Sequence, residues 1–294
     1  MQGRPPPLAR FGTLAICVLA FLLAPGNAQA QAPDWDTTEL ANGVFIFRYG
    51  GYNTAFVVTE DGVVAFDPIT PDAARLLAQE IRRSAPALPL LAIVYSHHHA
   101  DHASGASVLR AIFGGRVPII AHENALGPLI EAASPVLPAP DLTFSRRLTL
   151  RAGGRSIELL YLGPSHTTSM IVALVPDAKL AFAVDFVGND RVGYRDLGSH
   201  IFPDFFSALE ALDALDFDTI AFGHGPPGDH DSIRRQIRYY EDLRAAVEQA
   251  VAEGWTQDEA AERIRLAEYA DWTGYEEWFT LNVRGMHRWL SRGR

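Results

Sequence analysis

Ser96-His97-His98-His99-Ala100-Asp101-His102 is the most informative stretch of this 294-residue chain. It directly follows the apolar run 90–95, which predicts a buried strand. Side chains alternate along extended backbone, so His97 and His99 are expected to point to one side and His98 to the other. Asp101 and His102 then lie where the chain turns toward a predicted helix. Two imidazoles on one side, with a carboxylate and an imidazole just beyond, can bind two adjacent metal ions.

The same arrangement, a predicted strand followed by a possible metal ligand, recurs three more times. His166 follows the apolar run 157–162, Asp185 ends the run 180–184, and His224 follows 219–222. A single His or Asp in such a place would ordinarily be a cap or a turn residue. Four in series instead indicate a metal site. The alternative for residues 96–102, a His-rich surface loop without a function, does not account for this repetition.

In content and order, these residues resemble the motif of the metallo-β-lactamase-fold superfamily of metal-dependent hydrolases. The resemblance covers nearly the whole chain after residue 30. The pattern is most similar to the dinuclear members with a bridging Asp, such as glyoxalase II-like thioesterases and acyl-homoserine lactonases. It implies a first metal held by His97, His99 and His166. It implies a second metal held by Asp101, His102 and His224, with Asp185 bridging the two.

The ligand set predicts a zinc-dependent hydrolase with two Zn²⁺ ions per chain. Zinc accepts imidazole nitrogen and carboxylate oxygen, and a catalytic zinc site keeps one position open for water. Bound zinc lowers the pKa of that water to about 7, and two zinc ions can share the hydroxide and polarise a carbonyl. We expect attack on an ester, lactone, thioester or amide. Asp101 has a second predicted role, which is to orient the hydroxide and accept its proton. Ser165 and Ser169 flank His166 without a dedicated base, so a serine nucleophile is disfavoured.

The first 30 residues read as a secretory signal peptide. Arg4 and Arg10 precede the apolar run 11–24, and Ala28-Gln29-Ala30 forms a small-residue cleavage site. An apolar run of about fourteen residues is short for a membrane span. We therefore expect cleavage after Ala30, a single hydrolase domain over 31–294, and no stable membrane insertion after the signal is removed. The protein would be exported, either periplasmic or secreted.

The cysteine content and the net charge limit which metal ligands and partners are expected. Cys17 is the only cysteine and lies in the predicted signal peptide, so the mature chain would offer only His and carboxylate ligands and form no disulfide. The net charge of −10 disfavours nucleic acid as a partner, because nucleic-acid binding depends on basic contacts to phosphates. It disfavours a polyanionic substrate more weakly, since two divalent metal ions reverse the local sign. The expected partner is a small-molecule substrate.

Three alternatives on the same fold stay open. A β-lactam hydrolase fits the predicted compartment, although β-lactamases with a His-x-His-x-Asp-His motif usually lack a bridging residue such as Asp185. A mononuclear-iron persulfide dioxygenase would use His97, His166 and Asp185. A catalytically silent binding protein would retain its partner without metal. The diiron flavoproteins are disfavoured because they place Glu where this chain has His99, and glyoxalase II itself because its basic glutathione-binding residues have no match here.

The remaining sequence predicts an α+β fold with two similar blocks of strands and helices. Strands are predicted over 44–49, 55–59, 63–66, 117–121, 143–150, 157–162, 170–175 and 180–184, and helices over 71–84, 103–113, 241–253, 256–266 and 275–290. The segment 134–141, which contains three prolines, is the predicted boundary between the blocks. This order fits the αβ/βα four-layer sandwich that the resemblance implies, with additional C-terminal helices.

Two candidate site residues lie outside the metal motifs. Asp67, at the end of the run 63–66, could accept the N–H of a ligand imidazole or could simply start a turn before Pro68. Tyr194 lies in the nonperiodic segment 186–206, which is the predicted specificity loop. Lactonase-like members of the superfamily use a Tyr near the metals, which implies that Tyr194 could contact the substrate carbonyl. The aromatic residues of the C-terminal helices could line the cleft or pack a helical lid. The other histidines carry no motif and are expected to be ordinary: His122, His200, His230 and His287.

Overall fold

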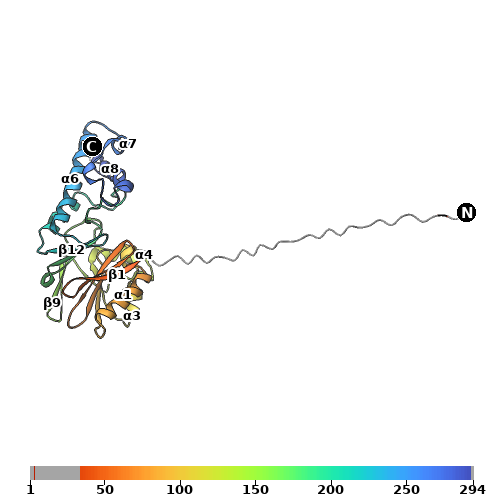
Figure 1. Cartoon of the computed structure of the whole chain (residues 1–294), viewed down its shortest axis with the longest axis vertical. Helices are drawn as coiled ribbons and strands as arrows, with labels where there is room; N and C mark the ends of the chain where they lie inside the picture. Colours follow the sequence, from red (N-terminus) through yellow and green to blue (C-terminus); the bar gives the residue numbers. More distant parts are fainter. Residues whose placement is uncertain (1–2, 4–33, 293–294) are drawn as a thin grey trace. The chain divides into compact units, whose positions relative to one another are not determined.

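The chain builds two β-sheets that pack face to face, with helices on both outer faces (Figure 1). The computed structural model describes Gly3 and residues 34–292, and residues 33–294 belong to one compact unit. Apart from Gly3, the predicted signal peptide lies outside the described residues.

The first sheet has seven strands in sequential order. The strands are β1 (Trp35–Ala41), β2 (Val44–Tyr49), β3 (Tyr52–Val58), β4 (Val63–Phe66), β5 (Leu90–Val94), β6 (Ile119–His122) and β7 (Leu142–Phe144). The pairs from β1 to β4 are antiparallel, whereas the pairs from β4 to β7 are parallel. A parallel connection needs a crossover, and α1 (Pro71–Ser84) supplies the one between β4 and β5.

The second sheet has five strands in the order β12-β11-β10-β9-β8. Their bounds are β8 (Arg147–Ala152), β9 (Arg155–Leu160), β10 (Val172–Val175), β11 (Leu180–Ala183) and β12 (Thr219–Phe222). Only β11 and β12 are parallel. The remaining helices are α2 (Ala100–Ala103), α3 (Ala106–Ile112), α4 (Leu126–Ala132), α5 (Asp204–Asp213), α6 (His230–Ala252), α7 (Gln257–Arg263) and α8 (Tyr275–Ser291).

Alternation along β4 explains the layered core. Val63 and Ala65 pack toward α1 and α3, while Val64 and Phe66 pack against the second sheet. The second sheet repeats this pattern, because Leu159 faces the first sheet and Leu160 faces the helices α5 to α8. Strands buried on both faces read as continuous apolar runs, which is how they appear in the sequence. The predicted α+β fold, an αβ/βα four-layer sandwich with C-terminal helices, is confirmed.

The predicted strand over 143–150 is wrong, because the chain changes sheets within it. Residues Leu142–Phe144 pair in parallel with β6 of the first sheet, and Arg147–Ala152 pair with β9 of the second. The boundary between the two blocks therefore falls at Ser145 and Arg146 and not within 134–141. The prolines of that segment mark a loop that still returns to the first sheet. A strand that switches sheets has no signature in the apolar pattern.

Three further differences concern helices and an edge strand. The predicted helix over 103–113 is divided at Ser104 and Gly105 into α2 and α3. A Cβ at Gly105 would lie 2.3 Å from the Pro68 carbonyl oxygen and 2.6 Å from that of Thr70. Only glycine allows the backbones to approach so closely there. The predicted helix over 241–253 begins earlier, at His230, and β1, α4 and α5 were not predicted.

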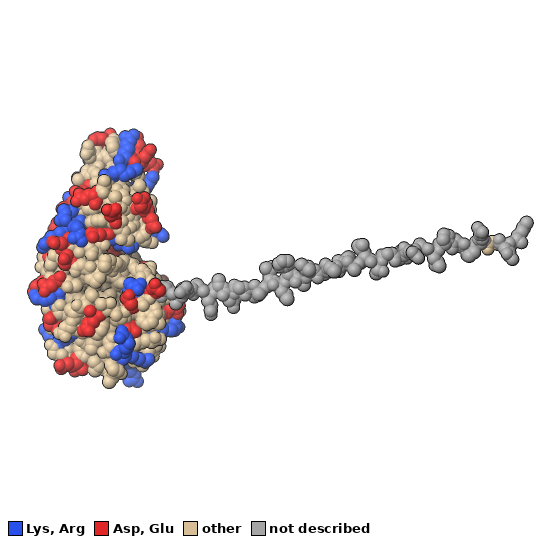
Figure 2. Space-filling model, in the orientation of Figure 1, with Lys and Arg blue, Asp and Glu red and all other residues tan. Residues whose placement is uncertain are grey.

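Charged side chains are mixed on the face that Figure 2 shows, and neither sign gathers there into one continuous patch. Within residues 34–292, none of the helices combines the length and the apolar character that a membrane span needs.

Candidate metal centre

The candidate ligands lie in the segments that follow strands, at one edge of the sandwich. His97 and His99 follow β5, Asp101 and His102 lie on α2, His166 lies between β9 and β10, Asp185 follows β11, and His224 follows β12. Because β11 and β12 are parallel, their carboxyl ends meet at this edge. Backbone hydrogen bonds join the two halves there: Ile171 N donates to Ser96 O at 2.9 Å, and Asn53 N donates to Gly223 O at 2.8 Å.

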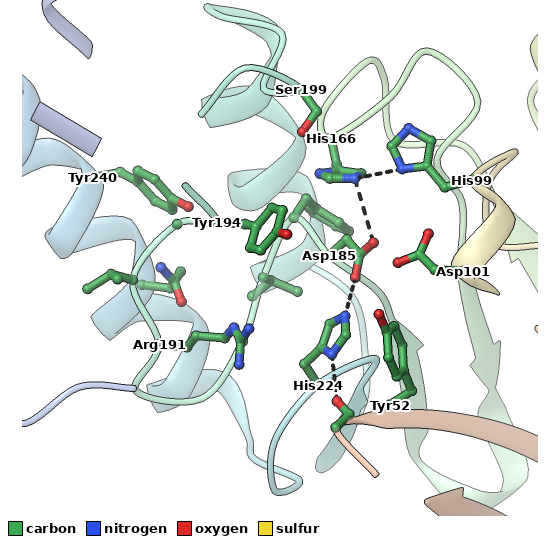
Figure 3. Close-up of a pocket in the computed structure, with 17 residues that line it drawn as sticks. Tyr52, His99, Asp101, His166, Asp185, Arg191, Tyr194, Ser199, His224 and Tyr240 are labelled. Carbon is green, nitrogen blue, oxygen red and sulfur yellow. Dashed lines mark hydrogen bonds and ion pairs between the residues drawn. The ribbon is translucent and has the colours of Figure 1, made fainter. Parts of the chain in front are cut away.

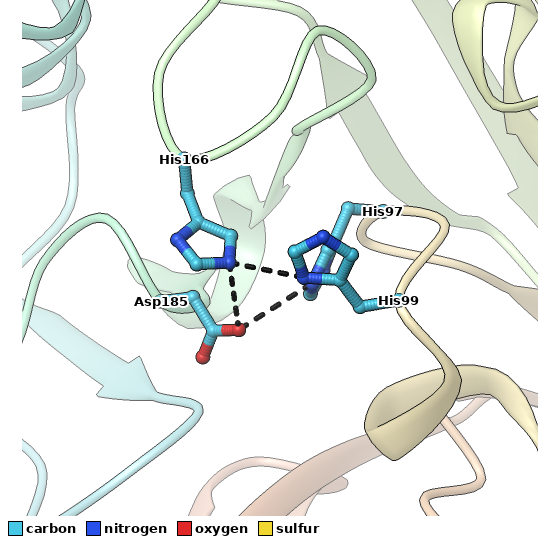
Figure 4. A group of neighbouring side chains, drawn as sticks. All are labelled: His97, His99, His166 and Asp185. Atoms are coloured by element: carbon cyan, nitrogen blue, oxygen red, sulfur yellow. Dashed lines mark hydrogen bonds and ion pairs between the residues drawn. The ribbon is translucent and has the colours of Figure 1, made fainter. Parts of the chain in front are cut away.

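The first cluster of side chains consists of three imidazoles and one carboxylate (Figure 4). His97, His99, His166 and Asp185 each offer a ligand atom within 4.8 Å of the others. Asp185 Oδ2 lies 3.4 Å from His97 Nε2 and 3.6 Å from His166 Nε2. His99 turns its Nδ1 toward His166 Nε2 at 3.1 Å. These four atoms converge on one point.

The second cluster shares the same carboxylate. His102, Asp185 and His224 also bring ligand atoms within 4.8 Å of one another. Asp185 Oδ2 lies 3.2 Å from His102 Nε2, and its Oδ1 lies 3.1 Å from His224 Nε2. Asp101 is outside this cluster, with its Oδ2 3.8 Å from His102 Nε2 and its side chain 49% exposed in the same pocket (Figure 3). Asp185 therefore stands between two groups of donors.

The buried donor atoms of the two clusters fit metal ions better than they fit one another. His97 Nε2, His102 Nε2 and Asp185 Oδ1 make no hydrogen bond among the described residues, although they lie at ion-pair distances. His97 and His102 are completely buried. Leaving such polar atoms unpaired costs roughly 1–3 kcal/mol each. Imidazole nitrogen and carboxylate oxygen are the donors that zinc prefers, so bound metal would remove this cost.

Contacts behind the imidazoles orient their metal-facing nitrogens. His224 Nδ1 donates to the Gly51 carbonyl at 2.7 Å, which leaves Nε2 as its free lone pair. Ser96 Oγ lies 2.9 Å from His97 Nδ1 and donates to Asp67 Oδ2 at 2.6 Å. The same Asp67 oxygen lies 3.4 Å from His102 Nδ1. Outer contacts of this kind fix the tautomer and the orientation of ligand imidazoles.

Asp67 and Asp185 both have positive φ, at 24° and 61°. Residues other than glycine rarely take this conformation, and it costs of the order of 1–3 kcal/mol. Asp185 lies just beyond the end of β11, after Val184, so the left-handed turn redirects its carboxylate from the sheet into the centre. Both residues whose carboxylates face the imidazoles therefore have a strained backbone conformation.

Burial and neighbouring carboxylates shift the pKa values of the buried imidazoles in different directions. Burial lowers the pKa of His97 well below its usual value and that of His166 to about 4. Both are therefore neutral near pH 7, the form that ligates metal. Burial also opposes protonation of His102, but the carboxylates of Asp185 and Asp67 outweigh it and raise the His102 pKa. Burial would raise the pKa of Asp185, yet the neighbouring His102 holds it well below the usual range.

Comparison with known proteins identifies the family of this chain. The family model described as the Metallo-beta-lactamase superfamily matches residues 48–224. The chain belongs to this superfamily. The matched range spans every candidate ligand, from His97 to His224. Helices α6, α7 and α8 lie beyond it.

Curated relatives and a solved structure agree with the family. The 2,4-dinitroanisole O-demethylase subunit alpha of Nocardioides sp. is 27% identical over 65% of this chain and 59% of its own length. A hydroxyacylglutathione hydrolase of Acidiphilium cryptum is 29% identical over 58% of this chain and 64% of its own. The chain thus spans less than two thirds of these relatives. A metallo-beta-lactamase from Pontibacter korlensis shares the fold, with a TM-score of 0.59, 23% identity, and coverage of 70% of this chain and 98% of that one.

A cavity of about 430 Å³ opens above the centre. Its metal side is lined by His99, Asp101, His166, Asp185 and His224. Tyr194, the predicted substrate contact, lines it too, with its ring 5.0 Å from that of Trp278 on α8. In Figure 3, Tyr194, Arg191 and Tyr240 lie on the side opposite His99 and Asp101. The predicted specificity loop 186–206 therefore forms part of this wall.

The cavity is also lined by polar side chains that were not predicted as individual site residues, among them Tyr52, Arg191, Gln236 and Tyr240. The Tyr52 ring centroid lies 4.9 Å from that of His224 and 5.8 Å from that of His102. Arg191 is inside the predicted specificity loop, and the sequence offered no reason to prefer it to its neighbours. The two residues on α6 lie outside every motif, so only the packing of that helix reveals them.

The histidines outside the motif have structural partners. His98 Nδ1 lies 2.8 Å from Ser169 Oγ, away from the two clusters. His122 Nε2 donates to the Ser145 carbonyl, and His230 lies 2.8 Å from an Asp213 oxygen. His200 is more involved than expected, because it is buried, hydrogen-bonds Tyr240 at 3.0 Å, and stands 6.1 Å from the His166 ring.

Proposed function

We propose that this member of the superfamily is an exported, zinc-dependent hydrolase that cleaves an ester, lactone, thioester or amide of a small molecule. The observation that carries the proposal is the shared position of Asp185, whose two carboxylate oxygens face four imidazole nitrogens at 3.1–3.6 Å. One carboxylate between two donor groups suits two metal ions better than one.

Each group of residues would have a distinct task. His97, His99 and His166 would hold the first ion, His102, His224 and Asp101 the second, and Asp185 both. When bound, such ions lower the pKa of a coordinated water molecule and polarise a carbonyl oxygen. Asp101 would orient the water and accept its proton at Oδ2. The half-exposed side chain of Asp101 suits a role in which a proton is passed on to solvent.

Two other reactions on this fold are outcomes of the same test. A β-lactam hydrolase would use the same groups on a strained amide. A persulfide dioxygenase would need one iron, held by His97, His166 and Asp185. The second cluster around His102 and His224 does not separate the dioxygenase from the hydrolase, because the dioxygenase branch can keep these residues. Metal content and oxygen consumption with a persulfide separate them.

The first experiment is metal analysis of the purified protein by elemental mass spectrometry, combined with hydrolysis of an ester, a lactone, a thioester and a β-lactam. We expect about two zinc ions per chain and turnover that a chelator abolishes and zinc restores. About one iron per chain, oxygen consumption with a persulfide and no hydrolysis would replace the proposal with the oxygenase.

A matched pair of variants tests the bridging carboxylate. Asp185→Ala should reduce metal content below two per chain and lower kcat/KM by at least 100-fold, because both clusters lose a shared ligand. His98→Ala, which removes a neighbouring imidazole outside the clusters, should leave metal content unchanged. Equal effects of the two substitutions would refute the assignment.

Export is a separate part of the proposal and rests on residues 1–30 of the sequence. Protein recovered from the periplasm or the medium should begin at Gln31 when its N-terminus is sequenced. Recovery only from the cytoplasm, with Met1 retained, would overturn this part and leave the hydrolase untouched.

A further inference from the structure

The cavity has a second end, away from the metal centre, and α6 forms one wall of it. Gln236 and Tyr240 line the cavity from this helix, and in Figure 3 Tyr240 lies on the far side from His99 and Asp101. The two α6 residues are four positions apart, so they are neighbours on one face of the helix. Helix α6 begins after the segment matched by the superfamily model. This wall is therefore built by a part of the chain that the superfamily motif does not include.

Gln236 is a buried polar side chain whose oxygen has no partner. The residue is 2% exposed, and its Oε1 makes no hydrogen bond among the described residues. Buried amides normally find partners, because burying an unpaired polar atom is costly. The side chain lines the cavity, so a group bound there can reach it. A ligand with an N–H group would supply the missing partner of this oxygen.

Tyr240 presents a hydroxyl whose orientation is set by His200. The Tyr240 hydroxyl oxygen lies 3.0 Å from His200 Nε2, and both side chains are buried. Burial lowers the pKa of His200 to about 3, so its imidazole is neutral near pH 7 and carries a single N–H. An N–H on Nδ1 would be a buried donor without an acceptor, because His200 Nδ1 has no partner within residues 34–292. The N–H therefore belongs on Nε2, where the Tyr240 oxygen accepts it, and the Tyr240 hydroxyl is free to donate into the cavity.

The surroundings of this hydroxyl hold it in one place. The Phe205 ring centroid lies 4.5 Å from that of His200 and 4.8 Å from that of Tyr240. The backbone beside His200 is tied to the loop of the metal ligand His166, because Ile201 N donates to the Ser165 carbonyl at 2.8 Å. A donor that is already fixed loses less entropy when it binds a ligand, so this wall is preorganised.

We infer that this wall binds a secondary amide of the substrate, remote from the bond that is cleaved, with Tyr240 donating to the amide oxygen and Gln236 accepting from the amide N–H. An amide presents one acceptor and one donor in a rigid plane, which matches one donor and one acceptor on neighbouring turns of a helix. Both protein groups are uncharged, so they favour a neutral polar group. Arg191, the cation at this end, stacks on the Trp278 ring, with its guanidinium carbon 5.0 Å from the ring centre. The inference rests on the proposed function and narrows its substrates to those that carry a second amide, which is not cleaved.

Three esters of equal chain length test this in the zinc-loaded protein. They are the 4-nitrophenyl esters of 5-acetamidopentanoic, 7-oxooctanoic and octanoic acid. The ketone lacks the amide N–H, and the octanoate lacks both the N–H and the remote oxygen. We expect kcat/KM to be about fivefold higher or more for the amide ester, because a hydrogen-bonding site rejects analogues that leave its groups unpaired. The esters of 4-acetamidobutanoic, 6-oxoheptanoic and heptanoic acid repeat the comparison with the amide one bond nearer the ester. Amide esters that are turned over no faster than the alkyl esters at both lengths would overturn the inference.

Two variants separate the two contacts. Tyr240→Phe removes only the donor, so it should lower kcat/KM for the amide and ketone esters by about 5- to 100-fold and for the octanoate by less than about threefold. Gln236→Met removes only the acceptor, so it should lower kcat/KM by about the same factor for the amide ester alone. A loss by one common factor for all three esters in Tyr240→Phe would mean that Tyr240 only supports the fold, and the site would be rejected.

Tyr239→Phe is the matched control, because it makes the same change one residue earlier. Tyr239 is buried on α6 and does not line the cavity, and its hydroxyl donates to Asn282 Oδ1. This variant should change kcat/KM for the three esters by one common factor and so keep the preference for the amide. Loss of the preference in Tyr239→Phe to the same extent as in Tyr240→Phe would contradict the assignment to Tyr240.

A binding measurement separates this inference from the proposed function. The free acids 5-acetamidopentanoate and octanoate differ only in the remote group, so isothermal titration reports on that group even if no ester is hydrolysed. Tyr240→Phe should weaken binding of the amide acid by about fivefold or more and leave binding of octanoate within about twofold. Absence of hydrolysis with this difference intact would reject the hydrolase and keep the amide site. Equal effects of Tyr240→Phe on both acids would reject the amide site.

Discussion

Replacing Asp67 with Asn tests how far the contacts behind the imidazoles control the metal centre. Asp67 is fully buried, and its Oδ1 accepts from Ser96 N at 2.7 Å. Its Oδ2 serves two groups, the Ser96 hydroxyl at 2.6 Å and His102 Nδ1 at 3.4 Å. Asn has nearly the same shape but no charge and only one acceptor oxygen, so it cannot serve all three groups.

The size of the effect follows from these contacts. A hydrogen bond to a charged group contributes about 1.5–3 kcal/mol, and 1.4 kcal/mol corresponds to about tenfold in affinity. Losing one such contact should weaken zinc binding by about 10- to 100-fold, which is the range for outer contacts to metal ligands. The cluster that contains His102 should lose its ion first, because Asp67 reaches His97 only through Ser96.

Competition with a chromophoric zinc chelator, followed by elemental analysis, measures the two affinities. Asp72→Asn is the matched control, since Asp72 is an exposed carboxylate of α1 that forms an ion pair with Arg75, and exposed pairs contribute little. If Asp67→Asn binds both ions as tightly as Asp72→Asn does, Asp67 has no part in orienting the ligands. Circular dichroism of both variants should match the parent protein, so that loss of metal is not confused with loss of fold.

The remaining predictions concern the supports of the site. Gly105→Ala should destabilise the protein by about 1–3 kcal/mol and reduce zinc content, because the new methyl group would overlap the Pro68 and Thr70 carbonyl oxygens and displace α2; unchanged melting temperature and zinc content would contradict this. Asn282→Ala should destabilise by about 3 kcal/mol in urea unfolding, since it leaves the Gly193 carbonyl and the Tyr239 hydroxyl without their partner. A loss below about 0.5 kcal/mol would show that water replaces these bonds. Removal of zinc by a chelator should lower the melting temperature, because binding to the native state alone stabilises it, and an unchanged melting temperature would mean that the two clusters do not bind zinc.

The sequence determined the layered core and the set of residues that meet at its edge. Apolar runs such as 90–95 and 180–184 have the length of strands that are buried on both faces. A polar residue that follows such a run therefore lies at the edge of the sheet, where the strand ends. The order His97, His166, Asp185, His224 was readable because each residue lies in the segment that follows an apolar run, and each of these runs forms a strand. Local patterns carry this information, since alternation along a strand repeats every two residues.

Other features depend on contacts between segments far apart in the chain. The switch between sheets at Ser145 was not readable because β7 and β8 differ only in which strand each one pairs with. The early start of α6 is an exception, because the capping box at Asp229 and the helical spacing of Ile233, Ile237 and Tyr240 are local signals that the sequence prediction missed. The mainly exposed strand β1 has no buried face to produce a pattern.

The two ends of the cavity differ in how far the sequence predicts them. The metal side follows from a compact motif, in which residue type and spacing already express the chemistry of ligation. The far side joins Arg191 from one loop to Gln236 and Tyr240 from a helix more than forty residues later. Arginine, glutamine and tyrosine are ordinary surface residues in a sequence, and only tertiary packing makes them buried and leaves polar atoms without partners. Burial changes the energy of a polar group, and burial is a property of the folded chain.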